Sequence, residues 1–150
     1  VLREVTDKLQ HELDTEKEAL SRLAELATDG VWDWHIPSNY EYMSPKLWDI
    51  LGIDYRTKRH HPDEWMELIH PEDLQKAMDL FHKHVSSRGK EPYYLEARYK
   101  HSSGKVVCVI CRGSIIEWDE NDKPIRMVGT HTDITDLKYP EGAPDAEWGG

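Results

Sequence analysis

The sequence lacks any long hydrophobic run, and this absence excludes a membrane-spanning helix. No apolar stretch approaches the roughly 20 residues that a helix needs to cross a bilayer. No hydrophobic segment precedes a small-residue cleavage site of the kind that ends a signal peptide. We therefore expect no membrane contact by this chain, although a chain that begins with Val1 rather than Met looks like a piece of a longer protein.

Cysteine and positive charge are also scarce. The 150 residues include 2 cysteines, which cannot build the disulfide framework of a small secreted domain, so a reducing, cytoplasmic setting is expected. Lys and Arg number 19 against 29 Asp and Glu, a net charge of −10. Nucleic-acid binding needs a basic face that neutralises phosphates, and this charge balance argues against it.

Catalytic and metal-binding motifs are missing as well. The sequence contains no Gly-rich phosphate loop, no nucleophile elbow and no His-Glu-x-x-His, and its carboxylates are dispersed rather than paired. Cys108 and Cys111 are three apart in a strand-like run, where side chains at that spacing point to opposite faces. We therefore predict neither a zinc site nor a redox pair, and a regulatory domain rather than an enzyme.

Residues 1–27 are typical of one long helix, because they contain no Gly or Pro and are rich in Glu, Lys, Leu and Ala. Apolar side chains recur in alternating steps of three and four, at Leu2, Leu9, Leu13, Leu20, Leu23 and Ala27. Thr6 and Glu16 interrupt this narrow seam, which is typical of a coiled coil. It predicts a dimerisation helix; the alternative is an amphipathic helix folded back on its own domain.

The remaining chain alternates between strand-like and helical segments. Residues 31–36 and 40–43 predict a hairpin, and Ser44-Pro45 and His70-Pro71 predict two helix starts. Three β-rich runs follow, at residues 93–100, 105–118 and 125–132. This order predicts an α+β fold, a five-stranded antiparallel sheet with helices over one face. We expect one domain over residues 28–138 and a flexible tail over residues 139–150, which contain Pro, Gly and little apolar material.

Four sequence blocks carry a resemblance to a known family. They occupy residues 29–34 (opening strand), 43–52 (first inner helix), 69–73 (helical middle) and 128–135 (closing strand with its Asp-Ile-Thr junction). In this order and spacing they resemble the PAS domain family with PAC-type C-terminal strands, over about residues 26–138. One departure is the turn between the third and fourth strands, where Ser103-Gly104 replaces the usual Asp-Gly.

The resemblance implies a sensor rather than an enzyme. PAS domains enclose a pocket between the concave sheet and the inner helices, and they often form homodimers through an N-terminal helix and the outer sheet face. They pass their state to an output domain, such as a histidine kinase or a diguanylate cyclase, in a two-component or related signal-transduction protein. Asp133 and Thr135 match the junction where that signal leaves the domain. Two alternatives remain: a dimerisation module without ligand, and a redox or gas sensor carrying flavin or haem.

Several large side chains are expected at the ligand pocket. Strand alternation puts Trp32 and Trp34 on one face, and the resemblance implies that this face is the inner one, with His131 on the pocket floor. The full set of candidate ligand-pocket residues is Trp32, Trp34, Met43, Trp48, Met78 and His131. The opposing interpretation is that these side chains fill the space and leave no cavity.

The sequence leaves the cofactor open. Light-sensing flavin relatives carry an Asn-Cys-Arg-Phe-Leu motif in the helical middle, whereas both cysteines here lie in the fourth strand. This excludes a covalent flavin adduct but not non-covalent flavin. The resemblance makes His82 a candidate haem ligand, because haem-binding relatives supply an axial ligand from this helix. His84 points about 200° away from it, and a solvated surface histidine is the alternative for His82.

Overall fold

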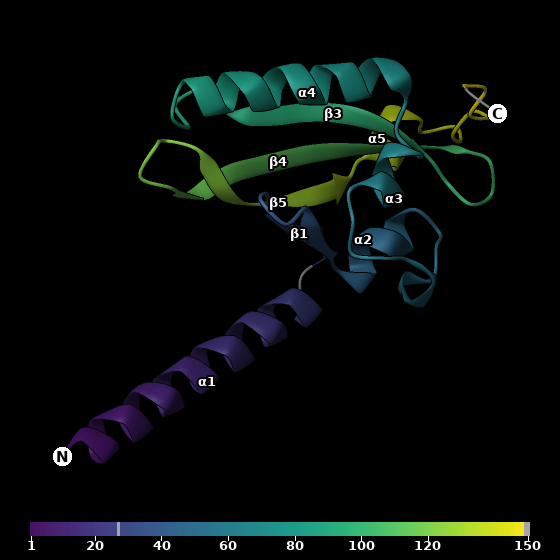
Figure 1. Ribbon diagram of the computed structural model, residues 1–150. Helices are drawn as coiled ribbons and strands as arrows, with labels where there is room; N and C mark the ends of the chain where they lie inside the picture. Colours follow the sequence, from purple (N-terminus) through teal and green to yellow (C-terminus); the bar gives the residue numbers. More distant parts are fainter. Residues whose placement is uncertain (27, 149–150) are drawn as a thin grey trace.

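The computed structural model describes residues 1–26 and 28–148, without the side chains of residues 20, 21, 24 and 25. Its elements are α1 (Leu2–Leu26), β1 (Gly30–His35), β2 (Tyr40–Met43), α2 (Pro45–Ile50), the 3-10 turn η1 (Tyr55–Thr57), α3 (Asp63–Met66), α4 (Pro71–Ser86), β3 (Tyr93–Lys100), β4 (Val106–Trp118), β5 (Pro124–Asp133) and α5 (Thr135–Lys138). The strands form one antiparallel sheet in the order β2-β1-β5-β4-β3 (Figure 1). The predicted α+β arrangement is confirmed.

Two glycines shape the inner face of the sheet, the face covered by α2, α3 and α4. Trp32 of β1 lies opposite Gly129 of β5, which in turn lies opposite Gly113 of β4. A Cβ atom on either glycine would collide with the Trp32 ring. The indole therefore lies flat across two neighbouring strands, and only glycine permits this close approach.

Hydrogen bonds at the helix starts connect the helical middle to the sheet. The Ser44 hydroxyl accepts from Leu47 N at 3.3 Å, as an N-cap does, and also from Val31 N at 2.9 Å. The imidazole of His70 accepts from Glu72 N at 3.1 Å at the start of α4. Both predicted helix starts are confirmed, and each is followed by proline in the first turn.

The edge strand β3 is covered by the start of α4. Arg98 O accepts from His70 N at 2.8 Å, and the buried Asp73 carboxylate accepts from Arg98 N at 2.8 Å and from Arg98 Nε at 2.9 Å. Burial raises the pKa of Asp73, but the Arg98 hydrogen bonds outweigh it and hold the pKa below its usual range. A paired carboxylate thus satisfies backbone groups that an edge strand would otherwise expose.

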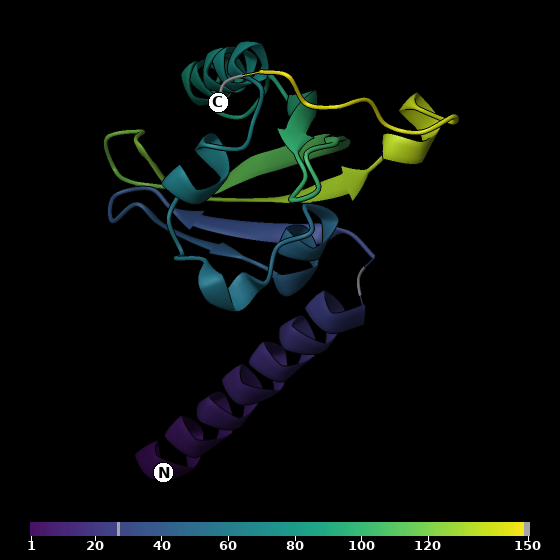
Figure 2. The ribbon, with the colours of Figure 1, turned by 90° about the vertical axis from the view of Figure 1, so that its right-hand side faces the viewer.

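Helix α1 extends away from the sheet and its covering helices (Figures 1 and 2). The alternative of a helix folded back on its domain is therefore not what the structure has. Leucine side chains of the predicted seam are exposed to solvent, namely Leu2, Leu9, Leu13 and Leu23. The seam positions Leu20 (its side chain) and Ala27 lie outside the described residues. No helix in the described ranges is long and apolar enough to cross a membrane.

The C-terminal segment, residues 139–148, differs from the flexible tail that the composition predicts. Beyond α5 the chain returns along the start of β4, where Val106 N donates to Pro144 O at 2.9 Å and Lys105 forms a β-bridge with Asp145. Three apolar side chains of the segment, Tyr139, Ala146 and Trp148, pack against an outer-face cluster of Val106, Cys108 and Ile134. Because apolar residues are few in this segment, its composition predicts a tail, although the three that it has make specific contacts.

Candidate functional site

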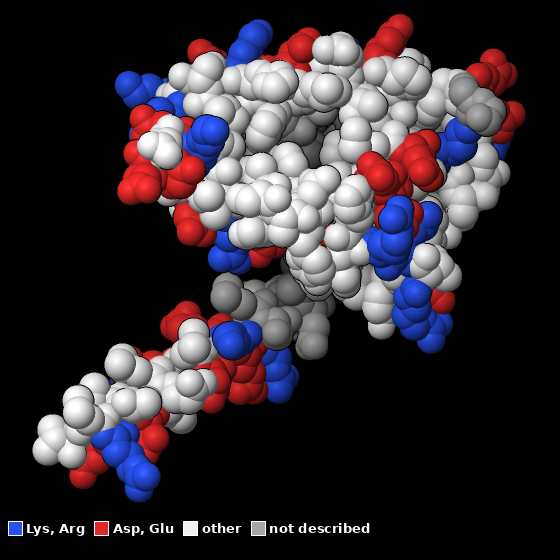
Figure 3. Space-filling view, viewed as in Figure 1, with Lys and Arg blue, Asp and Glu red and all other residues white. Residues whose placement is uncertain are grey.

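A pocket of about 440 Å³ lies between the inner face of the sheet and helices α3 and α4. Figure 3 shows a hollow on this side of the molecule, and most side chains around it are uncharged. The lining side chains come from β1, β2, β3, β4, β5, α3, α4 and three loop positions: Trp32, Trp34, Asn39, Glu41, Pro62, Asp63, Trp65, Met66, Ile69, Ala77, Met78, Phe81, His82, Tyr93, Leu95, Ala97, Tyr99, Cys111, Met127 and His131. This volume falls in the range of small-molecule sites, about 300–1,000 Å³.

The structure separates the six predicted pocket residues. Trp32, Trp34, Met78 and His131 line the large pocket. Met43 instead lines a neighbouring space of about 10 Å³, which is enough for about one water molecule. Trp48 of α2 lines neither, because it is 1% exposed and packs within the core. The opposing interpretation, in which large side chains fill the space, is not what the structure has.

Several aromatic rings line the pocket. The Trp34 ring packs against Phe81 of α4 at 5.3 Å between centroids, and its Nε1 donates to Asn39 Oδ1 at 2.9 Å. Trp32 and Tyr93 meet edge to face at 6.4 Å. These contacts hold the rings in fixed orientations, so their faces form a rigid apolar surface.

His131 lies on the inner side of β5, beside Cys111 of β4. Its Nε2 is 3.3 Å from the Tyr99 hydroxyl, whereas its Nδ1 is buried and has no hydrogen-bond partner among residues 1–26 and 28–148. Burial lowers the pKa of His131 to about 4. The ring is therefore neutral at neutral pH, because a charged imidazolium would lose its hydration there.

Glu41 of β2 is one of the pocket residues that the sequence analysis misses, and it is a buried carboxyl group. Its side chain is 5% exposed, and Oε1 accepts from Trp65 Nε1 at 3.0 Å. Burial raises the pKa of Glu41 to about 7, while the hydrogen bond from Trp65 opposes this rise. A signal was present: alternation in β2 places Glu41 on the same face as Met43, two residues on.

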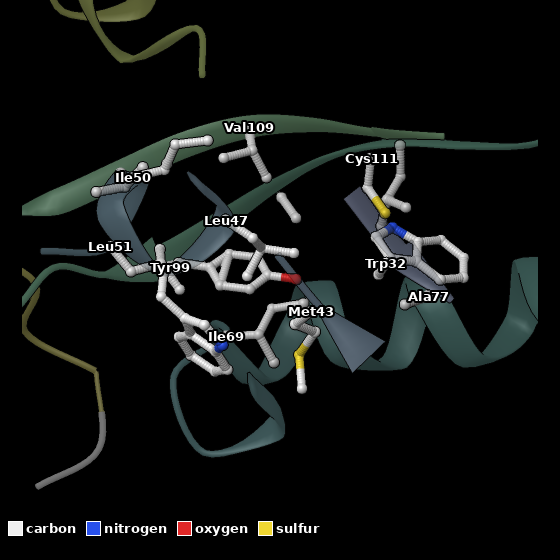
Figure 4. Packing of buried hydrophobic residues seen from close by; sticks show 14 of the residues in the cluster. Trp32, Met43, Leu47, Ile50, Leu51, Ile69, Ala77, Tyr99, Val109 and Cys111 are labelled. Atoms are coloured by element: carbon white, nitrogen blue, oxygen red, sulfur yellow. The ribbon is translucent and has the colours of Figure 1, made fainter. Parts of the chain in front are cut away.

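The two cysteines face opposite sides of β4, as the spacing predicts. Cys111 lies on the inner side next to Trp32, with the indole nitrogen directed toward its sulfur (Figure 4). Burial raises the pKa of Cys111 to about 12, an increase that the Trp32 and Tyr93 side chains partly offset. The thiol is therefore protonated and a poor nucleophile. Cys108 belongs to the outer-face cluster, and both cysteines are free thiols.

The two histidines of α4 occupy positions that differ from the expectation. His82, expected nearer the buried side, is exposed where it lines the pocket. His84 is 1% exposed; its Nδ1 donates to Glu91 O at 2.7 Å, and its Nε2 accepts from Ile115 N at 3.0 Å. The reason is periodicity, because His84 follows the buried Ala77 by seven residues and so shares its helix face.

The charges of the pocket do not fit flavin or haem, the two cofactors that the sequence analysis leaves open. None of the described lining residues is Lys or Arg, whereas Glu41 and Asp63 both line it. The phosphate of a flavin nucleotide and the propionates of haem would meet no cation there. Nor do His, Cys, Asp and Glu gather in threes that could hold a metal ion anywhere in the described part of the chain.

Asp133 and Thr135 form a hydrogen-bonded corner at the end of β5. Asp133 Oδ1 accepts from Thr135 N at 3.0 Å and from Thr135 Oγ1 at 2.5 Å. Thr135 Oγ1 in turn accepts from Cys108 N at 3.0 Å. The corner thus joins the end of β5 to the outer-face cluster, and Asp133 itself is exposed.

Known proteins share this architecture. The family model described as PAS fold matches residues 40–131. A sensory box histidine kinase/response regulator from Burkholderia thailandensis E264 is 29% identical, with a TM-score of 0.67 over 81% of this chain and 88% of that chain. The N-terminal domain of a diguanylate cyclase with PAS/PAC sensor from Marinobacter aquaeolei is 18% identical, with a TM-score of 0.61 over 74% and 98%.

More distant structures share the fold alone. The LOV domain of a blue-light activated histidine kinase from Erythrobacter litoralis EL346 is 15% identical, with a TM-score of 0.52 over 72% of this chain and 97% of that chain. Among curated proteins, none matches this sequence. The matched segment runs from β2 to the pocket histidine of β5 and contains α2, α3, α4, β3 and β4, whereas β1, which carries Trp32 and Trp34, precedes it. This chain belongs to the PAS family.

Proposed function

We propose that this chain is a regulatory domain that binds a small molecule in the inner pocket and relays its presence to an output domain. The observation that carries the proposal is the pocket of about 440 Å³, which persists although aromatic side chains surround it. A core that served stability alone would be packed without such a space. Output domains of the histidine kinase or diguanylate cyclase type are the expected recipients, since similar sensory domains belong to such proteins.

The path of the signal follows β5. His131 lines the pocket, and Asp133 lies two residues further along the same strand. A ligand that displaces the inner side chains therefore biases the strand whose end forms the Asp133–Thr135 corner. Hydrogen bonding of Thr135 to Cys108 extends this bias to the outer face of the sheet.

A second candidate function is dimerisation without ligand, and the exposed leucine seam of α1 favours it. A second copy of the chain would cover this seam, with the outer sheet face as a further contact. Both candidates include a homodimer. They differ in whether the pocket has an occupant.

The experiment that separates them is mass spectrometry of a heat-released extract from freshly purified protein, together with its visible spectrum and its mass by light scattering. Release of a small molecule at about one per chain supports the sensor. A colourless protein that releases nothing, and that stays dimeric, supports the dimerisation module. Flavin or haem absorption in the spectrum would contradict our conclusion that the charges of the pocket do not fit these cofactors.

A further inference from the structure

We propose that the pocket selects an organic cation with an aromatic or apolar body. This inference rests on the proposed function, because it requires the pocket to be a ligand site. Three observations carry it: the buried carboxyl of Glu41, the aromatic wall, and the absence of Lys and Arg from the described lining. The first and the third specify the charge of the ligand, and the second specifies its aromatic or apolar body.

Glu41 is a carboxyl group in a buried position without an ionic partner. Trp65 Nε1 donates to one of its oxygens, but no Lys, Arg or His in the described part of the chain forms a salt bridge with it. An ionised carboxyl in such a place loses its hydration and gains no countercharge in return. A ligand with a positively charged nitrogen would supply that charge.

The aromatic wall suits the same ligand. Six aromatic side chains line the pocket: Trp32, Trp34, Trp65, Phe81, Tyr93 and Tyr99. Ring faces attract cations within about 6 Å, and cages of several rings are a common way to bind organic ammonium groups. The Trp65 indole both hydrogen-bonds the carboxyl and lines the pocket, so ring and charge stand side by side.

The remaining titratable side chains do not oppose a cation. Those that line the pocket besides Glu41 are Asp63 of α3, His82 of α4, Tyr93 and Tyr99 of β3, Cys111 of β4 and His131 of β5. His131 is neutral at neutral pH, and the cysteine and tyrosines are protonated, because burial shifts each pKa away from its charged form. An anion would face the carboxyl groups of Glu41 and Asp63 and would find no Lys or Arg among the described lining residues.

The test uses three probes with one body and different charge: 2-naphthylmethylammonium, 2-naphthylmethanol and 2-naphthoate. Calorimetry measures their affinities for the whole chain at pH 8, where Glu41 is ionised. NMR of the tryptophan Nε1–H groups shows that binding occurs in the pocket. We expect the cation to bind at least about tenfold more tightly than the alcohol, and the carboxylate to bind most weakly.

Glu41→Gln supplies the matched variant, because the amide oxygen still accepts from Trp65 while the charge is lost. We expect it to weaken cation binding by about tenfold or more and to leave alcohol binding unchanged. Glu117→Gln, on the exposed part of β4, makes the same change in net charge and should alter neither affinity.

Three outcomes overturn the inference. Naphthoate or the alcohol binding in the pocket as tightly as the cation leaves the proposed ligand site in place and removes only its charge selectivity. Unchanged cation affinity in Glu41→Gln has the same meaning. Binding of none of the three probes, combined with an empty heat-released extract, overturns the ligand site together with the inference.

Discussion

Two carboxyl side chains are buried among the described residues, and their surroundings differ. Asp73, beneath the edge strand β3, is 2% exposed and accepts three hydrogen bonds from Arg98. Glu41, in the pocket wall, is 5% exposed and accepts one from Trp65. The pKa of Asp73 is lowered by its partner, whereas that of Glu41 is raised to about 7 by burial. Both carboxyl groups are buried, so the presence of an ionic partner is what distinguishes Asp73, a structural group, from Glu41, a candidate ligand-binding group.

Removal of the paired carboxyl should have the largest effect. We expect Asp73→Ala to lower the free energy of unfolding by about 3–5 kcal/mol, because it removes the carboxylate that accepts from Arg98 N and from the half-buried Arg98 guanidinium. Urea unfolding measures the loss. Glu72→Ala is the control, since Glu72 contacts the same Arg98 from an exposed position and should cost less than about 1 kcal/mol. Equal losses in the two variants would contradict the distinction.

Removal of the unpaired carboxyl's charge should instead stabilise the protein. The pKa of Glu41 is about 7 in the folded chain and 4.5 in its unperturbed state, so the folded state loses stability as pH rises from about 4.5 to 7. Glu41→Gln removes this cost, and we expect a gain of up to about 3 kcal/mol at pH 8 that shrinks toward pH 5. Urea unfolding at the two pH values checks it; a destabilised variant at pH 8 would contradict the unpaired state of Glu41.

The same ionisation should make cation binding depend on pH. A cation pairs with ionised Glu41, so below pH 7 each binding event must release a proton. We expect the affinity for 2-naphthylmethylammonium to rise by up to about tenfold per pH unit between pH 5.5 and 6.5, and to level off above pH 7. Calorimetry in two buffers of different ionisation enthalpy measures the released proton. An affinity that does not change with pH would mean that the aromatic wall, and not Glu41, provides the binding energy.

Asp133 is a third carboxyl, hydrogen-bonded but exposed, and its loss should cost least. Asp133→Ala removes the acceptor of Thr135 N and Oγ1, and we expect a loss of about 1 kcal/mol. The fold should stay intact while hydrogen exchange of the Thr135 amide speeds up. If the variant unfolds instead, the corner is a structural support rather than a relay.

Periodic patterns explain which parts of this fold follow from local sequence. Alternation in the strands, and Ser44-Pro45 and His70-Pro71 at helix starts, depend on near neighbours in the chain, and the structure has these elements where they are predicted. Trp48 is different: its spacing marks it as buried, but only the placement of α2 decides that it packs in the core and not at the pocket. The C-terminal segment likewise depends on contacts with β4 that lie about 40 residues away in sequence.

The sequence by itself determined the five strands and their succession along the chain, the two sides of β4 occupied by Cys108 and Cys111, and the long helix of α1, because each depends on side-chain period and on turn residues. Only the tertiary structure decided that Glu41 stands unpaired in an aromatic pocket, that His84 rather than His82 is buried, and that Gly113 and Gly129 make room for Trp32. These features depend on which side chains from distant strands and helices meet. The burial of Glu41 and its lack of an ionic partner set its pKa and the chemistry of the pocket, and both result from these long-range contacts.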